Sequence, residues 1–194
     1  MPLIGFSNVF GGCRALLLTA AILAKTSGSV DACSDYYGGK VISVDTGEPI
    51  EGAVVVIEWI KKPILAMDGA MSIHKFEEGL TAKDGSFSLS SCRGIDWNPL
   101  TFVHKFPLVA IFSPGYAPWP IRGDPSLAVN LEEGLLKNTT VKLAKLKTTD
   151  DIKRFSTPTS IGLFMYPPAA KAPLLLRLLN EQRRFAGLPP YSEQ

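Results

Sequence analysis

The stretch TGEPIEGAVVVIEW, residues 46–59, combines the chemistry of a tight turn with the longest strand-like run that follows the amino-terminal segment. Gly47 can adopt a positive φ angle, and Pro49 fixes its own φ and lacks an N–H donor, so a regular strand cannot run through this turn. Gly52 then permits a close backbone approach. Residues 54–60 are β-branched or aromatic except for Glu58. This composition predicts a strand that is buried along most of its length.

Other segments repeat the pattern of a short strand beside a turn. Residues 40–44, 108–112 and 139–147 each predict a strand. The turn at Asp84-Gly85 is followed by serine and apolar residues in alternation, which predicts a β-hairpin. Because no helix is expected between these strands, the sequence predicts an all-β, antiparallel sandwich. The residues expected to shape its turns are Gly47, Pro49, Gly52, Asp84, Gly85 and Gly115.

The carboxy-terminal part of the chain predicts a helix over residues 173–186. Pro173 suits the first helical turn, and Gly187 suits the position just after the last one. The residues expected to share one face are Leu175, Leu178, Leu179, Gln182 and Phe185. Because the helix has few basic residues, we interpret it as packed on the sandwich or on a partner subunit, in preference to lying on a membrane.

The first 32 residues have the features of a secretory signal peptide. Arg14 precedes the apolar run of residues 15–24, which is too short for a comfortable membrane span. Val30 and Ala32 stand at the −3 and −1 positions of a cleavage site. The chain is therefore expected to comprise a signal peptide (1–32), a sandwich domain (33–148) and a carboxy-terminal extension (149–194). An uncleaved amino-terminal anchor is the alternative.

Cleavage after residue 32 would leave two cysteines, Cys33 and Cys92, in the mature chain. In an oxidising compartment they could form a disulfide, which would stabilise the fold by about 2–4 kcal/mol. The segment around Cys33 also resembles a bacterial lipoprotein signal, although Asp31 departs from that pattern. Lipidation of Cys33 would exclude the disulfide, and a buried free thiol is the third possibility for Cys92.

The turn and strand motifs together resemble the carboxypeptidase regulatory-like domain family, a prealbumin-like or transthyretin-like sandwich. The resemblance covers residues 38–147 and is carried by Thr46, Gly47, Pro49, Ile50, Gly52, Ala53, Val55, Thr81, Asp84, Gly85, Phe87, Gly115, Tyr116, Val141 and Leu143. It implies a seven-stranded sandwich that carries none of the zinc ligands of the namesake enzymes. In bacteria, such modules are accessory parts of exported, surface or outer-membrane proteins.

Neither the charge nor the motifs indicate an enzyme or a nucleic-acid-binding protein. The net charge is +2, and basic residues are scattered among nearly as many acidic ones, which argues against nucleic-acid binding. The two histidines, His74 and His104, lie on separate segments without the clustered spacing of a zinc peptidase. They also lack the close histidine pair of an intradiol dioxygenase. We therefore expect no catalytic residues, no metal and no cofactor.

The best candidates for a binding site are aromatic and histidine side chains. Two long segments, residues 62–74 and 91–107, are expected to be functional or mobile loops. Together with the Gly-Tyr segment they are expected to gather one set of side chains at one end of the sandwich: Trp97, Tyr116, Trp119, His74 and His104. Exposed aromatic side chains suit contacts with protein or carbohydrate, whereas the alternative role for each is to cover the core or the base of a loop.

The sequence thus predicts an exported, membrane-tethered and non-catalytic sandwich. Its expected role is that of a structural or interaction module of the bacterial cell envelope, in the periplasm or at the outer membrane or cell surface. The expected partner is an envelope protein or carbohydrate. Two alternatives remain: a small metal-dependent enzyme on the same sandwich, and a soluble periplasmic carrier that holds its ligand in an apolar pocket.

Overall fold

The computed structural model describes residues 35–64, 71–91, 94, 97–103, 107–119, 137–161, 163 and 171–191. All of them belong to one compact unit, Cys33–Gln194. The expected signal peptide and three predicted site residues, Cys33, Cys92 and His104, lie outside the described residues. Among the described helices, none has the length and apolar character that crossing a membrane requires.

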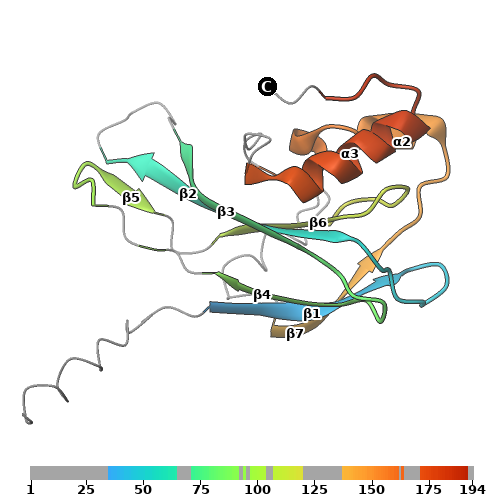
Figure 1. The fold of residues 1–194 in the computed structure, drawn as a ribbon, viewed down its shortest axis with the longest axis horizontal. Helices are drawn as coiled ribbons and strands as arrows, with labels where there is room; N and C mark the ends of the chain where they lie inside the picture. Colours follow the sequence, from blue (N-terminus) through green and yellow to red (C-terminus); the bar gives the residue numbers. More distant parts are fainter. Residues whose placement is uncertain are drawn as a thin grey trace, which may run out of the picture. The chain divides into compact units, whose positions relative to one another are not determined.

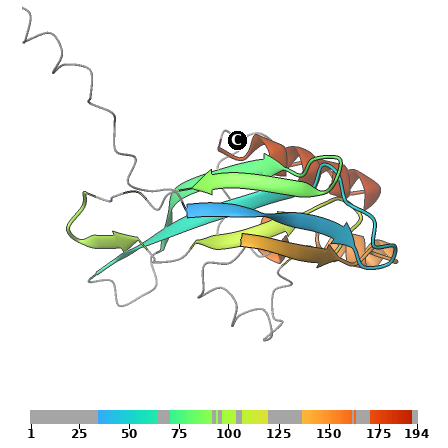
Figure 2. The same ribbon diagram turned by 90° about the horizontal axis from the view of Figure 1, so that it is seen from below.

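The described part of this unit is mostly β-sheet and has two sheets (Figure 1). The first sheet has the order β4-β1-β7, and the second places β2 between β3 on one side and β5 and β6 on the other. The bounds of the strands are β1 Asp35–Ser43, β2 Val54–Pro63, β3 Ser72–Leu80, β4 Ser86–Ser91, β5 Thr101–Val103, β6 Leu108–Phe112 and β7 Lys137–Leu143. Figure 2 shows the first sheet in front of the second, with the carboxy-terminal helix behind the second sheet.

Strand β2 is the buried strand that the sequence predicts. Side chains alternate between the two faces of a strand. Val55 and Ile57 therefore face the core between the sheets, whereas Val54 and Val56 belong to a second apolar cluster under the carboxy-terminal helix. Burial on both faces explains why the run is almost continuously apolar. Glu58, the one charged residue of the run, is also fully buried.

The turn at Asp84-Gly85 forms, but the predicted hairpin is wrong, because β3 and β4 belong to different sheets. Before the turn, Thr81 is hydrogen-bonded to the residue that precedes β2 of the second sheet: its Oγ1 accepts from the Ala53 N–H at 2.9 Å. At the other end, the Gly85 carbonyl accepts from the Val41 N–H of β1 at 2.9 Å. The connection is thus an arch between the sheets, which a local turn motif does not distinguish from a hairpin.

Asp84 stabilises this arch through local hydrogen bonds. Its Oδ1 accepts from the Ser86 Oγ–H at 2.6 Å and from the Ser86 N–H at 3.0 Å. These bonds, the side-chain one first, hold the pKa of Asp84 below its ordinary value of 3.8. A lowered folded-state pKa means that this stabilisation is present above the ordinary value and is lost as the pH falls through the folded-state value.

The sequence predicts a purely antiparallel arrangement, and this is wrong for β1 and β7, which pair in parallel. Parallel neighbours need a crossover connection, and the long chain between these two strands supplies it. The register shifts between Gly38 and Gly39, where Asn138 has a positive φ of 61°. A side chain at Gly39 would collide with the Thr139 carbonyl, so glycine permits the close approach of β7.

Among the described residues after the last strand, the helical segments are α2 Thr149–Arg154, the short 3₁₀ helix η2 Pro158–Ile161, and α3 Pro173–Phe185. The sequence analysis missed α2. The sequence signal for α2 is the pair Thr148 and Asp151. The Thr148 side chain accepts a hydrogen bond from the Asp151 N–H at 3.1 Å and so caps the helix. A capping residue three positions before an acidic one is readable in the sequence.

The predicted carboxy-terminal helix is confirmed and ends as expected. Gly187 has a φ of 68°, and the Leu188 N–H donates to the Arg183 carbonyl, which closes the helix end. The buried residues of α3 are Leu175, Leu176, Leu178, Leu179 and Gln182. Phe185 was expected on the same face, but this last residue of α3 is exposed. Leu175, Leu178 and Leu179 cluster with residues of β2 and β6, so the helix belongs to this core.

Glu78 of β3 caps the amino-terminal end of α3. Its two carboxylate oxygens accept hydrogen bonds from the Leu174 N–H at 2.7 Å and the Leu175 N–H at 2.9 Å. The residue at the normal capping position, Ala172, provides no side-chain bond. A carboxylate at this end of a helix is favoured both by the free N–H groups and by the helix dipole.

Replacing Glu78 with alanine should therefore lower the free energy of unfolding by about 2 kcal/mol, since two N–H donors lose a charged acceptor. Urea denaturation followed by circular dichroism measures this loss. Glu77→Gln is the matched control, because Glu77 pairs with Lys75 at 2.5 Å on the opposite face of β3 and both side chains are partly exposed. The control should change stability by less than about 1 kcal/mol. Equal losses in the two variants would contradict the capping role.

Candidate functional site

The predicted site residues Tyr116 and Trp119 lie at the edge of the hydrophobic core between the two sheets. Both follow β6 and pack against the apolar cluster between the sheets. Tyr116 forms an isolated bridge with Lys145, and Trp119 forms one with Ile111. Since each side chain is partly buried in this way, the core-covering role describes them better than a binding role.

A buried glutamine holds the Gly115 turn in place. The Gln182 side chain of α3 is fully buried, and its Oε1 accepts a hydrogen bond from the Gly115 N–H at 2.7 Å. Its Nε2 donates to the Ile152 carbonyl of α2 at 3.3 Å. One amide thus joins the turn after β6 to both helices, which explains why a polar residue occupies the apolar face of α3.

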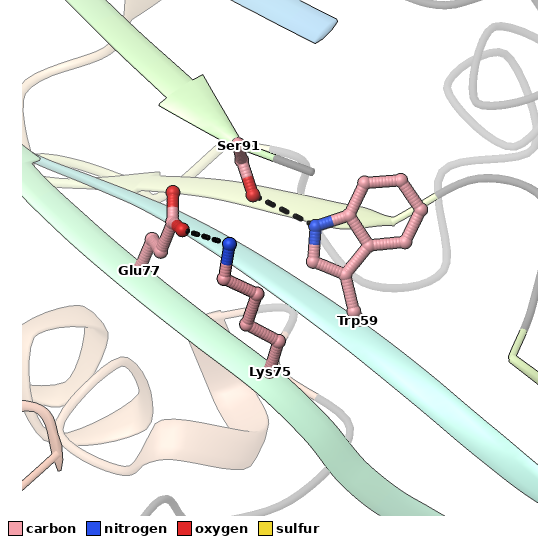
Figure 3. A network of polar contacts seen from close by, with 4 residues as sticks. All are labelled: Trp59, Lys75, Glu77 and Ser91. Carbon is pink, nitrogen blue, oxygen red and sulfur yellow. Dashed lines mark hydrogen bonds and ion pairs between the residues drawn. The ribbon is translucent and has the colours of Figure 1, made fainter. Parts of the chain in front are cut away.

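A polar network closes the opposite end of the core (Figure 3). The indole N–H of Trp59 donates to the Ser91 Oγ at 2.8 Å and so links β2 to the end of β4. Lys75 and Glu77 pair beside it on β3. Trp59 and Ser91 are both buried, so their hydrogen bond joins the two sheets inside the core, whereas Lys75 and Glu77 are partly exposed.

His74 lies at an irregularity of β3. The register between β2 and β3 shifts after Trp59, so that Lys75 pairs with Trp59 and Ile73 pairs with Ile60, which leaves His74 as the extra residue. Gly94 lies close by, because a side chain at this glycine would come within 3.4 Å of the His74 Nε2. The extra residue redirects a side chain, and such bulges are common near functional sites.

Trp97 is the one predicted aromatic residue that is fully open to solvent, with 88% of its surface exposed. Leu100 and Phe102, in the same segment as Trp97, and Ile64, just after β2, are also exposed. Ile64 and Leu100 are adjacent, because the Ile64 N–H donates to the Leu100 carbonyl at 2.8 Å, and Phe102 pairs with Lys62. We call Ile64, Trp97, Leu100 and Phe102 the β5 patch.

The β5 patch stands out among the exposed apolar residues. The described residues contain seven large apolar side chains that are exposed, and four of them form this patch. The other three, Val44, Leu80 and Phe185, lie in a turn, at a strand end and on α3. Single exposed apolar residues are normal, whereas a group of them marks an interaction surface.

The expected gathering of all the candidates at one end is wrong. Trp119 pairs with Ile111, which pairs with Val55 near the start of β2. The β5 patch pairs with Lys62 and Pro63 at the other end of the same strand. The strand pairing therefore places Tyr116 and Trp119 away from Trp97 and His74. The position of His104 lies outside the described residues.

Within the parts of the chain that the structure describes, no three His, Cys, Asp or Glu side chains are grouped so that they could hold a metal ion. His74 is described, but His104, Cys33 and Cys92 are not.

No protein-family model, no curated protein and no solved structure matches this chain. The resemblance to the carboxypeptidase regulatory-like domains thus remains an interpretation of the sequence motifs.

The sequence analysis missed three members of the β5 patch, namely Ile64, Leu100 and Phe102. They lie in or next to segments without a strand signal, and β5 has only three residues. The alternation of Leu100 and Phe102 was the available signal, but two apolar residues are too few to define a strand face.

Proposed function

We propose that this protein is an exported, non-catalytic β-sandwich that acts as an interaction module of the bacterial cell envelope through its β5 patch. The observation that carries the proposal is the exposure of Trp97 together with three other large apolar side chains around one short strand. Aromatic and aliphatic side chains that leave water on binding supply most of the energy of such contacts.

The architecture supports a binding role, because the patch is held by a rigid framework. Strand β5 pairs with the last residues of β2, whose earlier part is buried on both faces. Contact residues on a rigid scaffold lose little conformational entropy on binding. Export rests on the sequence of residues 1–32, and tethering to the membrane rests on that segment or on lipidation of Cys33.

Site-specific photo-crosslinking in the native host tests this function. Trp97 is replaced by p-benzoylphenylalanine in the full chain, and the same replacement at Phe185, which is exposed on α3, provides the control. We expect position 97 to form a discrete adduct with one envelope component and position 185 to form none. The mass of the adduct identifies the component as protein, carbohydrate or lipid. Equal labelling at both positions, or no adduct at position 97, would overturn the proposal.

Export has its own measurement, which is the intact mass of the mature protein with and without reduction. A chain that begins at Cys33 and carries acyl groups establishes a lipoprotein. A gain of two hydrogens on reduction establishes the disulfide instead. Retention of the residues before Cys33 would contradict cleavage.

A further inference from the structure

The residues after α3 turn back and run along the helix (Figure 1). Gly187, with a φ of 68°, reverses the chain, and residues 188–191 follow without regular secondary structure. We call these four residues, Leu-Pro-Pro-Tyr, the tail. Its two prolines are exposed, whereas Tyr191 is half-buried and packs against the apolar cluster under α3. The tail is thus held through Tyr191, while its prolines face the solvent.

Two side chains of α3 bind main-chain groups of the tail. The Asn180 Oδ1 accepts a hydrogen bond from the Tyr191 N–H at 2.7 Å, and the Asn180 Nδ2 donates to the Tyr191 carbonyl at 3.4 Å. One amide therefore makes the pair of bonds that a neighbouring strand would make. Arg183, three residues further along the same helix face, donates through Nε to the Pro189 carbonyl. Recognition of main-chain groups in this way is typical of peptide-binding sites.

The ring and the hydroxyl of Tyr191 are bound as well. The Arg183 guanidinium lies over the ring, 4.1 Å from its centroid, in a cation–π contact. The Tyr191 hydroxyl donates to the carbonyl of Ser156, which follows α2, at 3.3 Å. Arg183 Nη1 donates to the same carbonyl at 3.3 Å, so the body of the domain orients this guanidinium. Such a preorganised group loses little entropy when a ligand binds to it.

These contacts specify an extended segment in which a tyrosine follows two prolines. Consecutive prolines favour the extended polyproline conformation, and because proline has no N–H, the carbonyl of Pro189 is the polar main-chain group that this residue offers. None of the contacts with Asn180, Arg183 or Ser156 requires that the bound segment be covalently joined to α3. The same groups would bind this sequence when another chain presents it.

We propose that Asn180, Arg183 and the Ser156 carbonyl form a recognition site for a proline-rich, tyrosine-containing segment of a partner protein, and that the tail occupies this site in cis and keeps it closed. Hydrogen bonds at the surface exchange readily with water, so each contact holds the tail only modestly. The advantage of the tail is its short tether, which gives it an effective concentration of about millimolar. The site is separate from the β5 patch, so this inference goes beyond the proposed function.

A peptide with the sequence of the tail tests the site in the purified full chain. Fluorescein-labelled Gly-Leu-Pro-Pro-Tyr-Ser is titrated with the wild type and with Tyr191→Ser, and fluorescence anisotropy reports binding. We expect the peptide to bind Tyr191→Ser at least about tenfold more tightly than the wild type, because the altered tail no longer competes from its tethered position. Tyr191→Leu, which retains an apolar contact with the cluster but loses the hydroxyl, should also open the site.

Matched changes in the chain and in the peptide locate the binding. In the Tyr191→Ser background, Asn180→Ala should weaken binding by at least about tenfold, since the main-chain groups of the tyrosine lose their partner. Phe185→Ser should leave it unchanged, because Phe185 is not at the spacing that would place it on the same helix face. A peptide with alanine in place of its tyrosine, or in place of both prolines, should bind more weakly. Circular dichroism checks the fold of each variant.

The outcomes either support this site or reject it. If neither tail variant folds, or if both fold and neither binds the peptide at millimolar concentration, the tail is only a packed part of the core. Binding that Asn180→Ala does not weaken would overturn the assigned residues. A wild-type dimer in sedimentation equilibrium that Tyr191→Ser abolishes would show that two copies exchange their tails, and would reject a partner protein as the occupant. None of these results changes the crosslinking expected at position 97, so the proposed function stands or fails separately.

Discussion

Replacing Leu179 with alanine is expected to lower the free energy of unfolding by about 3 kcal/mol, within the usual range for a buried leucine. The Leu179 side chain is 0% exposed and belongs to the cluster that α3 forms with Val54 and Phe112. Alanine would leave a cavity between the helix and the second sheet. The surrounding backbone is a sheet that is packed on both faces, so it has little freedom to close that cavity.

Phe185→Ala in the same helix is the matched control. Phe185 is 58% exposed, so its loss should change stability by less than about 0.5 kcal/mol. Urea denaturation of both variants, followed by near-ultraviolet and far-ultraviolet circular dichroism, makes the comparison. A single shifted transition for Leu179→Ala would indicate that α3 unfolds with the sheets. A small loss, or two separate transitions, would contradict the common core.

Local chemistry explains which elements the sequence predicts well. The apolar run of β2, the turns at Gly47 and Gly85, and the end of α3 at Gly187 each depend on residues that are close together in the chain. Their conformations follow from alternation, from positive φ angles and from helix termination, and the structure has all of them. The two apolar faces of β2 follow from the same alternation.

Pairings between distant segments explain the errors. The Asp84-Gly85 turn looks alike whether the chain turns back within one sheet or crosses to the other, and the choice depends on the contacts of Thr81 and Val41. The parallel pairing of β1 with β7 joins segments that are separated by most of the domain. Such decisions depend on the whole core, which no local motif encodes.

The candidate site also combines a part that local sequence predicts with a part that depends on pairing between distant segments. The sequence identified Trp97, Tyr116 and Trp119 as aromatic residues on connections, but aromaticity alone does not separate a core cover from an exposed contact. Trp119 packs against the core between the sheets and is partly buried, whereas Trp97, four residues before β5, is exposed. Leu100 and Phe102 lie in the same segment as Trp97, whereas Ile64 comes from the end of β2 and could be assigned to the patch only once β2 and β5 were paired.

Gly85→Ala should cost considerably more stability than Gly47→Ala, although the two glycines have almost the same backbone conformation. Their φ angles are 77° and 72°, so alanine at either position loses about 1–2 kcal/mol from the strained conformation alone. Gly47 has open space around it, whereas a side chain at Gly85 would meet the Val41 carbonyl and the ring of Pro49. The clash forces the arch between the sheets to move, which adds about 1–3 kcal/mol.

Chemical denaturation of the two variants isolates the effect of this contact, because the conformational strain is common to both. We expect the midpoint for Gly85→Ala to fall well below that for Gly47→Ala. Since the Gly85 carbonyl also accepts the Val41 N–H, displacement of the arch would weaken the join between β1 and the connection. Equal midpoints would mean that Pro49 and Val41 move aside at little cost. In that case the fold would need Gly85 for its φ angle and not for the close approach of the turn to Val41 and Pro49.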